Sequence, residues 1–227
     1  MAVSPVLLGL QLPIDLTRDL VPLARFVQAN WAIAVPKDAP FRTLPELIAA
    51  ARARPRALNY GHAGVGSLQH LATEWLRREA GIGLLPITYR GTGPAVLDLI
   101  AGRLHLLLTS LGDFSAQIQA GDLRLLAMAD DIGSPLFPNA PQVSVTLPGF
   151  AVSSWLGACG PRGIAPEVVA WWERVTQAAL TAPGLPQRLT QFGLTPGYQD
   201  AAEFGRTMEA GRARWRAVAE SAGIRAE

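Results

Sequence analysis

The sequence predicts an α/β protein with largely parallel sheet. Short apolar runs alternate with amphipathic stretches along most of the chain, an order typical of strands joined by helical crossovers. Glycine-rich turns separate two of these runs from the stretches that follow them. The chain has 227 residues, of which 49% are hydrophobic and 17% charged, so it is long enough for one large domain or two small ones with an ordinary core.

Signals at helix ends place most of the expected elements. Thr43 with Glu46 forms a capping box, Pro55 stops the helix that it opens, and a glycine closes four later helices. The expected helices cover residues 43–54, 68–80, 95–101, 115–120, 167–180, 186–192 and 200–222. The expected strands cover residues 21–29, 31–35, 57–60, 84–89, 104–109, 123–128 and 151–159, after a strand end and loop at 3–12. The proline-rich residues 130–150 predict a long connection of the kind that links lobes.

Charge and cysteine content exclude several classes of protein. The net charge is +2 and the arginines are scattered, so we expect no nucleic-acid partner. Cys159 is the only cysteine, which rules out an internal disulfide. No apolar run approaches the ~20 residues of a membrane span. The first ten residues lack a basic segment and a cleavage site, so we do not expect a signal peptide there.

Residues 59–72 form the central motif of the sequence, and the remaining elements are expected to place it in a cleft. A short strand enters a turn with glycines at 61, 64 and 66, and the turn opens a helix at Leu68. Glycines permit positive φ and close approach of a ligand, and the first turn of a helix presents unpaired N–H groups. We therefore expect an anion seat formed by Ala63, Gly64, Val65, Gly66 and Ser67. The alternative is a plain connecting turn, since the G-x-G-x-x-G and Gly-Lys-Ser/Thr patterns are absent.

Further ligand contacts are expected at three other places. A second glycine turn opens a second helix, and it contributes Tyr89, Gly91, Thr92 and Gly93. Thr109 and Ser110 end an expected strand, where open α/β sheets bind ligands. Trp155 either lines the cleft or fills the region between lobes.

His70 is a cleft-lining or structural candidate, one helical turn after Ser67. A catalytic role would pair it with Asp98 as acid and base, but no nucleophile or second carboxylate accompanies them. His62 and His105 show no metal-ligand spacing. We expect no metal, no cofactor and no enzymatic activity.

Beyond single motifs, the chain resembles the Bug family, the substrate-binding proteins of tripartite tricarboxylate transporters. The resemblance is carried by Thr43-Leu44-Pro45-Glu46-Leu47-Ile48 and by the turn Asn59-Tyr60-Gly61 with Ala63-Gly64-Val65-Gly66-Ser67. Further matching stretches lie at 15–23, 70–72, 89–102, 120–127, 134–150, 154–157 and 161–166. Together they cover almost the whole chain in order.

The resemblance implies a type II periplasmic-binding-protein fold with two lobes that close on a small carboxylate. Residues 33–129 would form the second lobe with the glycine seat. Residues 1–32 and 130–227 would form the remaining first lobe, the hinge and the C-terminal helices. It also implies a periplasmic location, or a cytoplasmic one for a chain without an export signal, and membrane transporter subunits as partners.

Several departures from the family pattern accompany the resemblance. Family members begin with a signal peptide, a first strand and a first-lobe turn that this chain lacks, so we expect an incomplete first lobe. His62 stands where a small serine is usual, His105 where an aspartate is common, and Thr109-Ser110 where Asp-Asn is usual. Two alternatives to a solute receptor stay open: an interaction or dimerisation module, and an enzyme that uses His70 and Asp98.

Overall fold

The computed structural model describes residues 15, 18–152 and 154–224, and the strand end expected at 3–12 lies outside them. The described chain divides into two compact units. Unit 1 combines the residues up to Ala29 with those from Ser154 onward. Unit 2 is the continuous segment Asn30–Ser153 between them. Among the described residues, no helix has both the length and the apolar character needed to cross a membrane.

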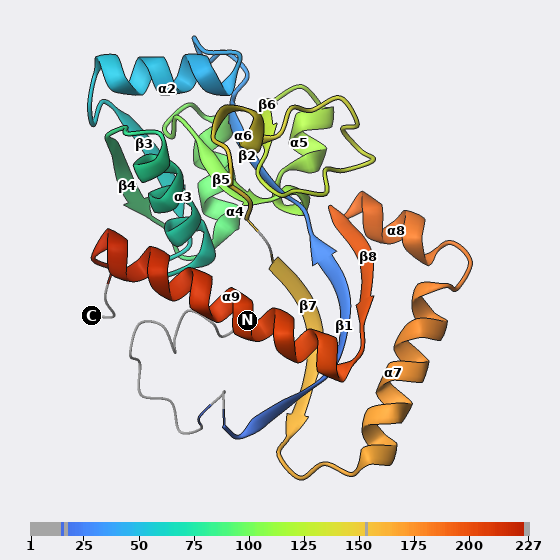
Figure 1. The fold of residues 1–227 in the computed structure, drawn as a ribbon. Coiled ribbons are helices and arrows are strands. Elements are labelled where there is room, and N and C mark those ends of the chain that lie inside the picture. Colours follow the sequence, from blue (N-terminus) through green and yellow to red (C-terminus); the bar gives the residue numbers. More distant parts are fainter. Residues whose placement is uncertain (1–14, 16–17, 153, 225–227) are drawn as a thin grey trace. The chain divides into compact units, whose positions relative to one another are not determined.

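Unit 1 is built on an antiparallel sheet of three strands in the order β7-β1-β8. The strands are β1 (Leu20–Ala29), β7 (Ser154–Pro161) and β8 (Leu194–Gln199). Three helices accompany them, α7 (Pro166–Leu180), α8 (Leu185–Gln191) and α9 (Ala201–Ala222) (Figure 1).

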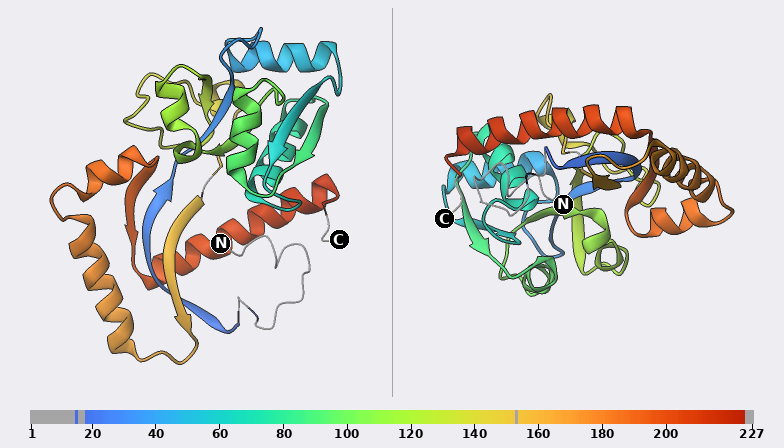
Figure 2. Two further views of the ribbon diagram at one scale, coloured as in Figure 1. Left: turned by 180° about the vertical axis from the view of Figure 1, so that it is seen from behind. Right: turned by 90° about the horizontal axis from the view of Figure 1, so that it is seen from below.

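The helices of unit 1 cover both faces of this sheet. Leu156 contributes to a pocket that α7 and α8 also line, whereas its neighbour Trp155 packs edge-on against Phe204 of α9, with ring centroids 4.6 Å apart. Because successive strand residues point to opposite faces, α9 lies on the face opposite α7 and α8 (Figure 2).

Unit 2 holds five strands. They are β2 (Trp31–Pro36), β3 (Leu58–His62), β4 (Leu84–Thr88), β5 (Leu107–Ser110) and β6 (Leu123–Met128). One sheet has the order β5-β2-β6, and β3 pairs in parallel with β4. A parallel bridge between Tyr60 and Leu106, the residue before β5, joins the two sheets.

Helices connect the strands of unit 2. They are α2 (Leu44–Ala53), α3 (Leu68–Glu79), α4 (Thr92–Ile100), the 3₁₀ turn η1 (Leu111–Asp113), α5 (Ser115–Gln119) and α6 (Val143–Thr146). Local signals set their starts: the Thr43 side chain caps α2 by accepting from the Glu46 amide, and Ser67 caps α3 in the same way. A core cluster that includes Ala32, Leu99 and Leu111 packs α4 and η1 against β2.

The expectation of mainly parallel sheet is wrong for unit 1 and holds only in part for unit 2. β1 is antiparallel to both β7 and β8, and β2 is antiparallel to both β5 and β6. The strands joined by helices, β7 with β8 and β5 with β6, do run the same way. However, β1 lies between β7 and β8, and β2 lies between β5 and β6. Each of these middle strands is therefore antiparallel to both of its neighbours.

Three elements, η1, α6 and β8, were not expected from the sequence. β8 contains Pro196 and Gly197, which weaken a strand pattern, but β8 pairs only with β1 and lies at the sheet edge, where proline is tolerated. α6 is four residues long, too short to show a helical period. β7 begins at Ser154, three residues after the expected start.

The proline-rich segment after β6 packs within unit 2, whereas the sequence grouped it with the first lobe. The Asp130 side chain is buried and accepts hydrogen bonds from the amides of Trp31 (2.7 Å), Ile132 (3.0 Å) and Gly133 (2.7 Å). The amide of Val152 donates to the Ala129 carbonyl at 2.7 Å. These contacts place the unit boundaries at 29/30 and 153/154, instead of the expected 32/33 and 129/130.

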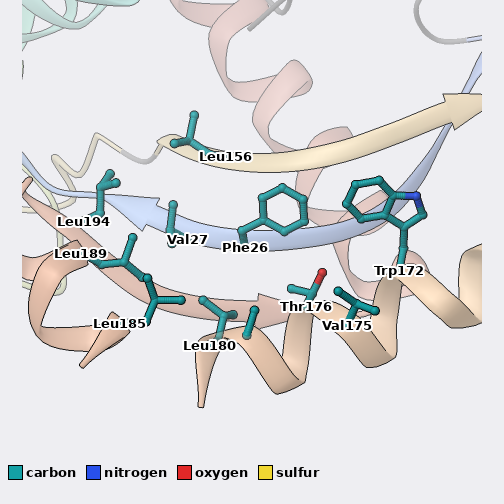
Figure 3. Close-up of a pocket in the computed structure, with 11 residues that line it drawn as sticks. Phe26, Val27, Leu156, Trp172, Val175, Thr176, Leu180, Leu185, Leu189 and Leu194 are labelled. Carbon is teal, nitrogen blue, oxygen red and sulfur yellow. The ribbon is translucent and has the colours of Figure 1, made fainter. Parts of the chain in front are cut away.

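A pocket of about 330 Å³ lies between the unit 1 sheet and helices α7 and α8. Figure 3 shows Phe26 of β1 and Trp172 of α7 along it; their rings stack with centroids 6.1 Å apart. Thr176 carries the one hydroxyl in this lining and is 6% exposed. No hydrogen bond joins that hydroxyl to any residue that the structure describes.

We expect Thr176→Val to raise the free energy of unfolding by about 0.5–1 kcal/mol, because a methyl group replaces a hydroxyl that makes no hydrogen bond to a described residue in an otherwise apolar pocket lining. Chemical denaturation measures the change. Thr181→Val is the matched control, since the Thr181 hydroxyl is exposed and donates to the carbonyls of Gln177 and Ala178. A loss of stability in the Thr176 variant would show that its hydroxyl has a stabilising partner.

Candidate functional site

The expected ligand contacts of unit 2 meet at one edge of its sheet. β3, β4 and β5 run in the same direction, so their carboxyl ends lie together, as in other open α/β sheets that bind ligands there. The Gln69 side-chain amide, on α3, connects the start of α4 with the end of β5. It donates to the hydroxyl of Thr92 at 3.0 Å and to that of Thr109 at 3.2 Å.

The turn between β3 and α3, residues 63–67, has the backbone that its glycines predict. Gly64 has φ +117° and Gly66 has φ +73°, values that side-chain-bearing residues rarely adopt. The amide of Ser67 donates to the Gly64 carbonyl at 3.1 Å. The Ser67 hydroxyl accepts from the amide of His70 at 3.3 Å and so caps α3; this contact uses the oxygen as an acceptor, and its part as an added anion donor stays a prediction.

Three amides of this turn have no hydrogen-bond partner in the described chain: those of Ala63, Gly64 and Val65. Val65 is 50% exposed, so the turn is open to solvent. The first amides of α3 follow directly and carry the partial positive charge of a helix start. The turn can therefore donate several hydrogen bonds to one anion.

A second set of donors opens α4. Gly91 has φ +102° and precedes the helix without a side-chain cap, which leaves the first-turn amides of Thr92 and Gly93 without an intrahelical partner. The Tyr89 hydroxyl is turned to α4, where it donates to Asp98 at 2.7 Å. Burial and the neighbouring Asp98 carboxylate raise the pKa of Tyr89 to about 12.

Thr109 and Ser110 end β5 but differ in their surroundings. The Thr109 side chain is fully buried, and its hydroxyl donates to Asp113 at 2.5 Å while accepting from Gln69. Ser110 is half-buried, and its hydroxyl makes no hydrogen bond to a described residue. Ser110 is therefore the hydroxyl available to a ligand, whereas Thr109 holds the strand end in place.

Other residues singled out in the sequence lie elsewhere or are occupied. Trp155 belongs to unit 1, where it packs on Phe204, and its part in binding stays a prediction. Asp98 is held by Tyr89 and by an ion pair with Arg103, and no hydrogen bond joins it to His70 in the described chain. Within that part of the chain, no three His, Cys, Asp or Glu side chains are grouped to hold a metal ion.

Gln69 is the contact that sequence reasoning missed. A glutamine on a helix face belongs to no recognisable motif, unlike its neighbours Ser67, a helix cap, and His70, a titratable side chain. The place of Gln69 two residues after the N-cap puts it at the start of α3, where it bridges the first residue of α4 and the end of β5. Only the three-dimensional arrangement reveals this role.

Comparison with known proteins identifies the family. The model described as "Tripartite tricarboxylate transporter family receptor" (TctC) matches residues 2–224. The chain belongs to this family. The family is one of receptors, and its model covers the glycine turns and both units described above, so the resemblance in the sequence is confirmed.

Relatives and solved structures agree. The UPF0065 protein in the tcbD-tcbE intergenic region of Pseudomonas sp. strain P51 is 33% identical over 81% of this chain and 55% of its own length. Protein BugT of Bordetella pertussis is 28% identical over 85% of this chain and 61% of its own. The chain thus spans about 55–61% of these relatives. "R. palustris Rpa4515 with adipate" is similar with a TM-score of 0.87 and 30% identity, covering 95% of this chain and 72% of that one, which supports the mixed α/β fold.

The φ of Gly64 predicts the outcome of a matched pair of substitutions. A Cβ built on Gly64 or on Gly211 meets no atom within 4 Å, so the main difference between the two sites is the backbone conformation. Gly64→Ala should lower the free energy of unfolding by about 1 kcal/mol because of its positive φ. Gly211→Ala, in the interior of helix α9, should raise it by about 0.5–1 kcal/mol. Thermal unfolding of both variants tests this; equal effects would contradict the assigned turn geometry.

Proposed function

We propose that this chain is a solute-binding receptor that delivers a small carboxylate to a tripartite tricarboxylate transporter. The observation that carries the proposal is the pair of glycine turns at the carboxyl ends of β3 and β4. Each turn opens a helix and presents backbone N–H groups without partners in the described chain. The family assignment supports the receptor class, and the related R. palustris protein with adipate supports the ligand class.

Backbone donors suit this ligand class. A carboxylate accepts several hydrogen bonds, and charge-assisted bonds from amides are shorter and stronger than neutral ones. The proposed contacts are Ala63, Gly64 and Val65 in the first turn, Gly91, Thr92 and Gly93 in the second, and the Ser110 hydroxyl. Lys37, the single lysine, lies outside both turns, and Arg90, which directly precedes Gly91, is exposed. A site made of amides binds the charge of a carboxylate without a buried ion pair, so the rest of the ligand sets selectivity.

The further parts of the proposal rest on the family. The partners are the membrane subunits of the transporter, and the working compartment is the periplasm. The role is binding and release, so no catalysis is required of His70 and Asp98. Relatives described as a "periplasmic transporter" at 25% identity and a TctC solute-binding protein from Polaromonas at 26% share the fold, with TM-scores of 0.89 and 0.81.

Thermal unfolding with adipate tests the ligand class. At about 100 times its dissociation constant, a ligand that binds only the folded state stabilises it by about 2.7 kcal/mol. We expect adipate to raise the unfolding temperature and adipamide, its uncharged analogue, to leave it unchanged. Equal shifts with both compounds would overturn recognition of the carboxylate.

A charge placed in the first turn tests the location of the site. Val65 is 50% exposed, so Val65→Glu should fold normally yet repel a bound carboxylate and weaken adipate binding about tenfold or more. Val65→Gln controls for side-chain size. Val145→Glu, at an 80% exposed position of α6 in the same unit, controls for net charge. Calorimetric affinities that are equal in the Val65 and Val145 variants would place the site elsewhere.

A further inference from the structure

Two histidines lie stacked beneath the turn of residues 63–67. His62 is the last residue of β3, and His70 belongs to the first turn of α3. Their ring centroids are 4.4 Å apart with an interplanar angle of 16°. His62 is 2% exposed and His70 is partly buried. The stacked rings therefore connect the end of β3, which leads into the turn, with the first turn of α3, which follows it.

Each ring contacts the backbone of one glycine of the turn. The Nδ1 atom of His70 accepts a hydrogen bond from the Gly66 amide at 3.1 Å. The Nδ1 atom of His62 lies 2.9 Å from the carbonyl oxygen of Gly64. These two glycines flank Val65 and have the two positive φ values of the turn. Both unusual backbone positions are thus held by an imidazole.

The partners determine where each ring carries its proton. Since Nδ1 of His70 accepts from an N–H, its proton resides on Nε2. Since Nδ1 of His62 faces a carbonyl oxygen, it must donate, and its Nε2 then accepts from the Thr88 hydroxyl at 3.2 Å. Both rings satisfy these contacts in the neutral form. The two tautomers are opposite, as required by one donor and one acceptor in the backbone.

We infer that His62 and His70 act together as positioning residues that hold the 63–67 turn in its binding conformation, and that protonation of His70 releases it. This inference rests on the proposed function, because the turn is the proposed carboxylate seat. While the rings contact the backbone of Gly64 and Gly66, the amides of Ala63, Gly64 and Val65 have no partner in the described chain and stay available to a ligand. A positive charge on His70 removes the acceptor for the Gly66 amide and turns it into a second donor facing a donor.

The surroundings favour the neutral pair at neutral pH. Burial lowers the pKa of His70 to about 4, with a further contribution from His62, and burial also lowers the pKa of His62. The titratable and charged neighbours are Tyr60 on β3 and Glu74 and Arg77 on α3. The Glu74 carboxylate accepts a hydrogen bond from the Tyr60 hydroxyl at 2.7 Å and forms an ion pair with Arg77. These partners reduce the stabilisation that its negative charge can give to a protonated imidazole.

Asparagine and phenylalanine variants separate the hydrogen bonds from the titration. Asparagine carries its amide oxygen and nitrogen on Cγ, where histidine carries Nδ1, so His70→Asn keeps an acceptor and His62→Asn keeps a donor. Neither variant titrates. The corresponding phenylalanine variants keep a stacked ring and lose the hydrogen bond. His105→Asn is the matched control, since that histidine contacts Asn59 and not the turn.

A ligand-free measurement tests the geometry on its own. Nitrogen-15 NMR of the imidazoles should show the Nε2–H tautomer for His70 and the Nδ1–H tautomer for His62 at pH 7. Hydrogen exchange of the Gly66 amide should be about tenfold faster in His70→Phe and nearly unchanged in His70→Asn and His105→Asn. The same tautomer on both rings, or equal exchange in the three variants, would overturn the inference.

Adipate titration calorimetry tests the consequence for binding. We expect the phenylalanine variants to bind about fivefold more weakly at pH 7 and the asparagine variants to bind as the parent does. The His62→Asn/His70→Asn double variant has no imidazole at these positions, so its loss of affinity between pH 6 and pH 4 measures the protonation of adipate itself. The affinity of the parent protein should fall more steeply over the same range. Parallel pH profiles would remove the role of His70 protonation.

The two measurements also separate this inference from the proposed function. If no variant and no parent protein binds adipate, the ligand class fails while the NMR result still decides the role of the two histidines. If adipate binds but the histidine variants match His105→Asn in exchange and affinity, the function stands and the inference fails.

Discussion

A single stretch of chain supplies the middle strand of both three-stranded sheets. β1 and β2 follow each other with only Asn30 between them, and each is the middle strand of a three-stranded sheet. Asp130 fixes the start of β2, because its buried carboxylate accepts from the Trp31 amide and from two amides of its own loop. Burial raises the pKa of Asp130, yet three backbone donors compensate the carboxylate. Neither sheet exists without this stretch.

The candidate site depends on the same arrangement. β2 lies on one side of β5, and β3 is bridged to the other, so the carboxyl ends of β3, β4 and β5 face one edge. The Gln69 side chain also connects this edge by donating hydrogen bonds to the hydroxyls of Thr92, at the start of α4, and Thr109, at the end of β5. The Gln69, Thr92 and Thr109 side chains near the site bind each other, which leaves the backbone amides and the Ser110 hydroxyl as the proposed ligand contacts.

Local signals allowed much of the fold and the core of the candidate site to be predicted from the sequence. The Thr43 cap, the positive-φ glycines 64, 66 and 91 and the helix starts all depend on neighbouring residues. Predictions failed where distant residues decide the structure. The insertion of β1 between β7 and β8 brings together strands more than a hundred residues apart. The hydrogen bonds of Gln69 to Thr92 and Thr109 and the stacking of His62 on His70 likewise leave no local pattern.

The place of β1 in its sheet has a consequence for the order of folding during synthesis. Unit 2 is one continuous segment, whereas β1 waits for partners that end at Gln199, and Arg25 binds the Gly197 carbonyl across 172 positions. At the ribosome's rate of about 5–20 residues per second, β1 stays unpaired for on the order of ten seconds. Pro22, which has no N–H to offer, makes it a poorer template for a foreign strand in that interval. The strand that organises the finished protein is thus protected while it has no sheet to join.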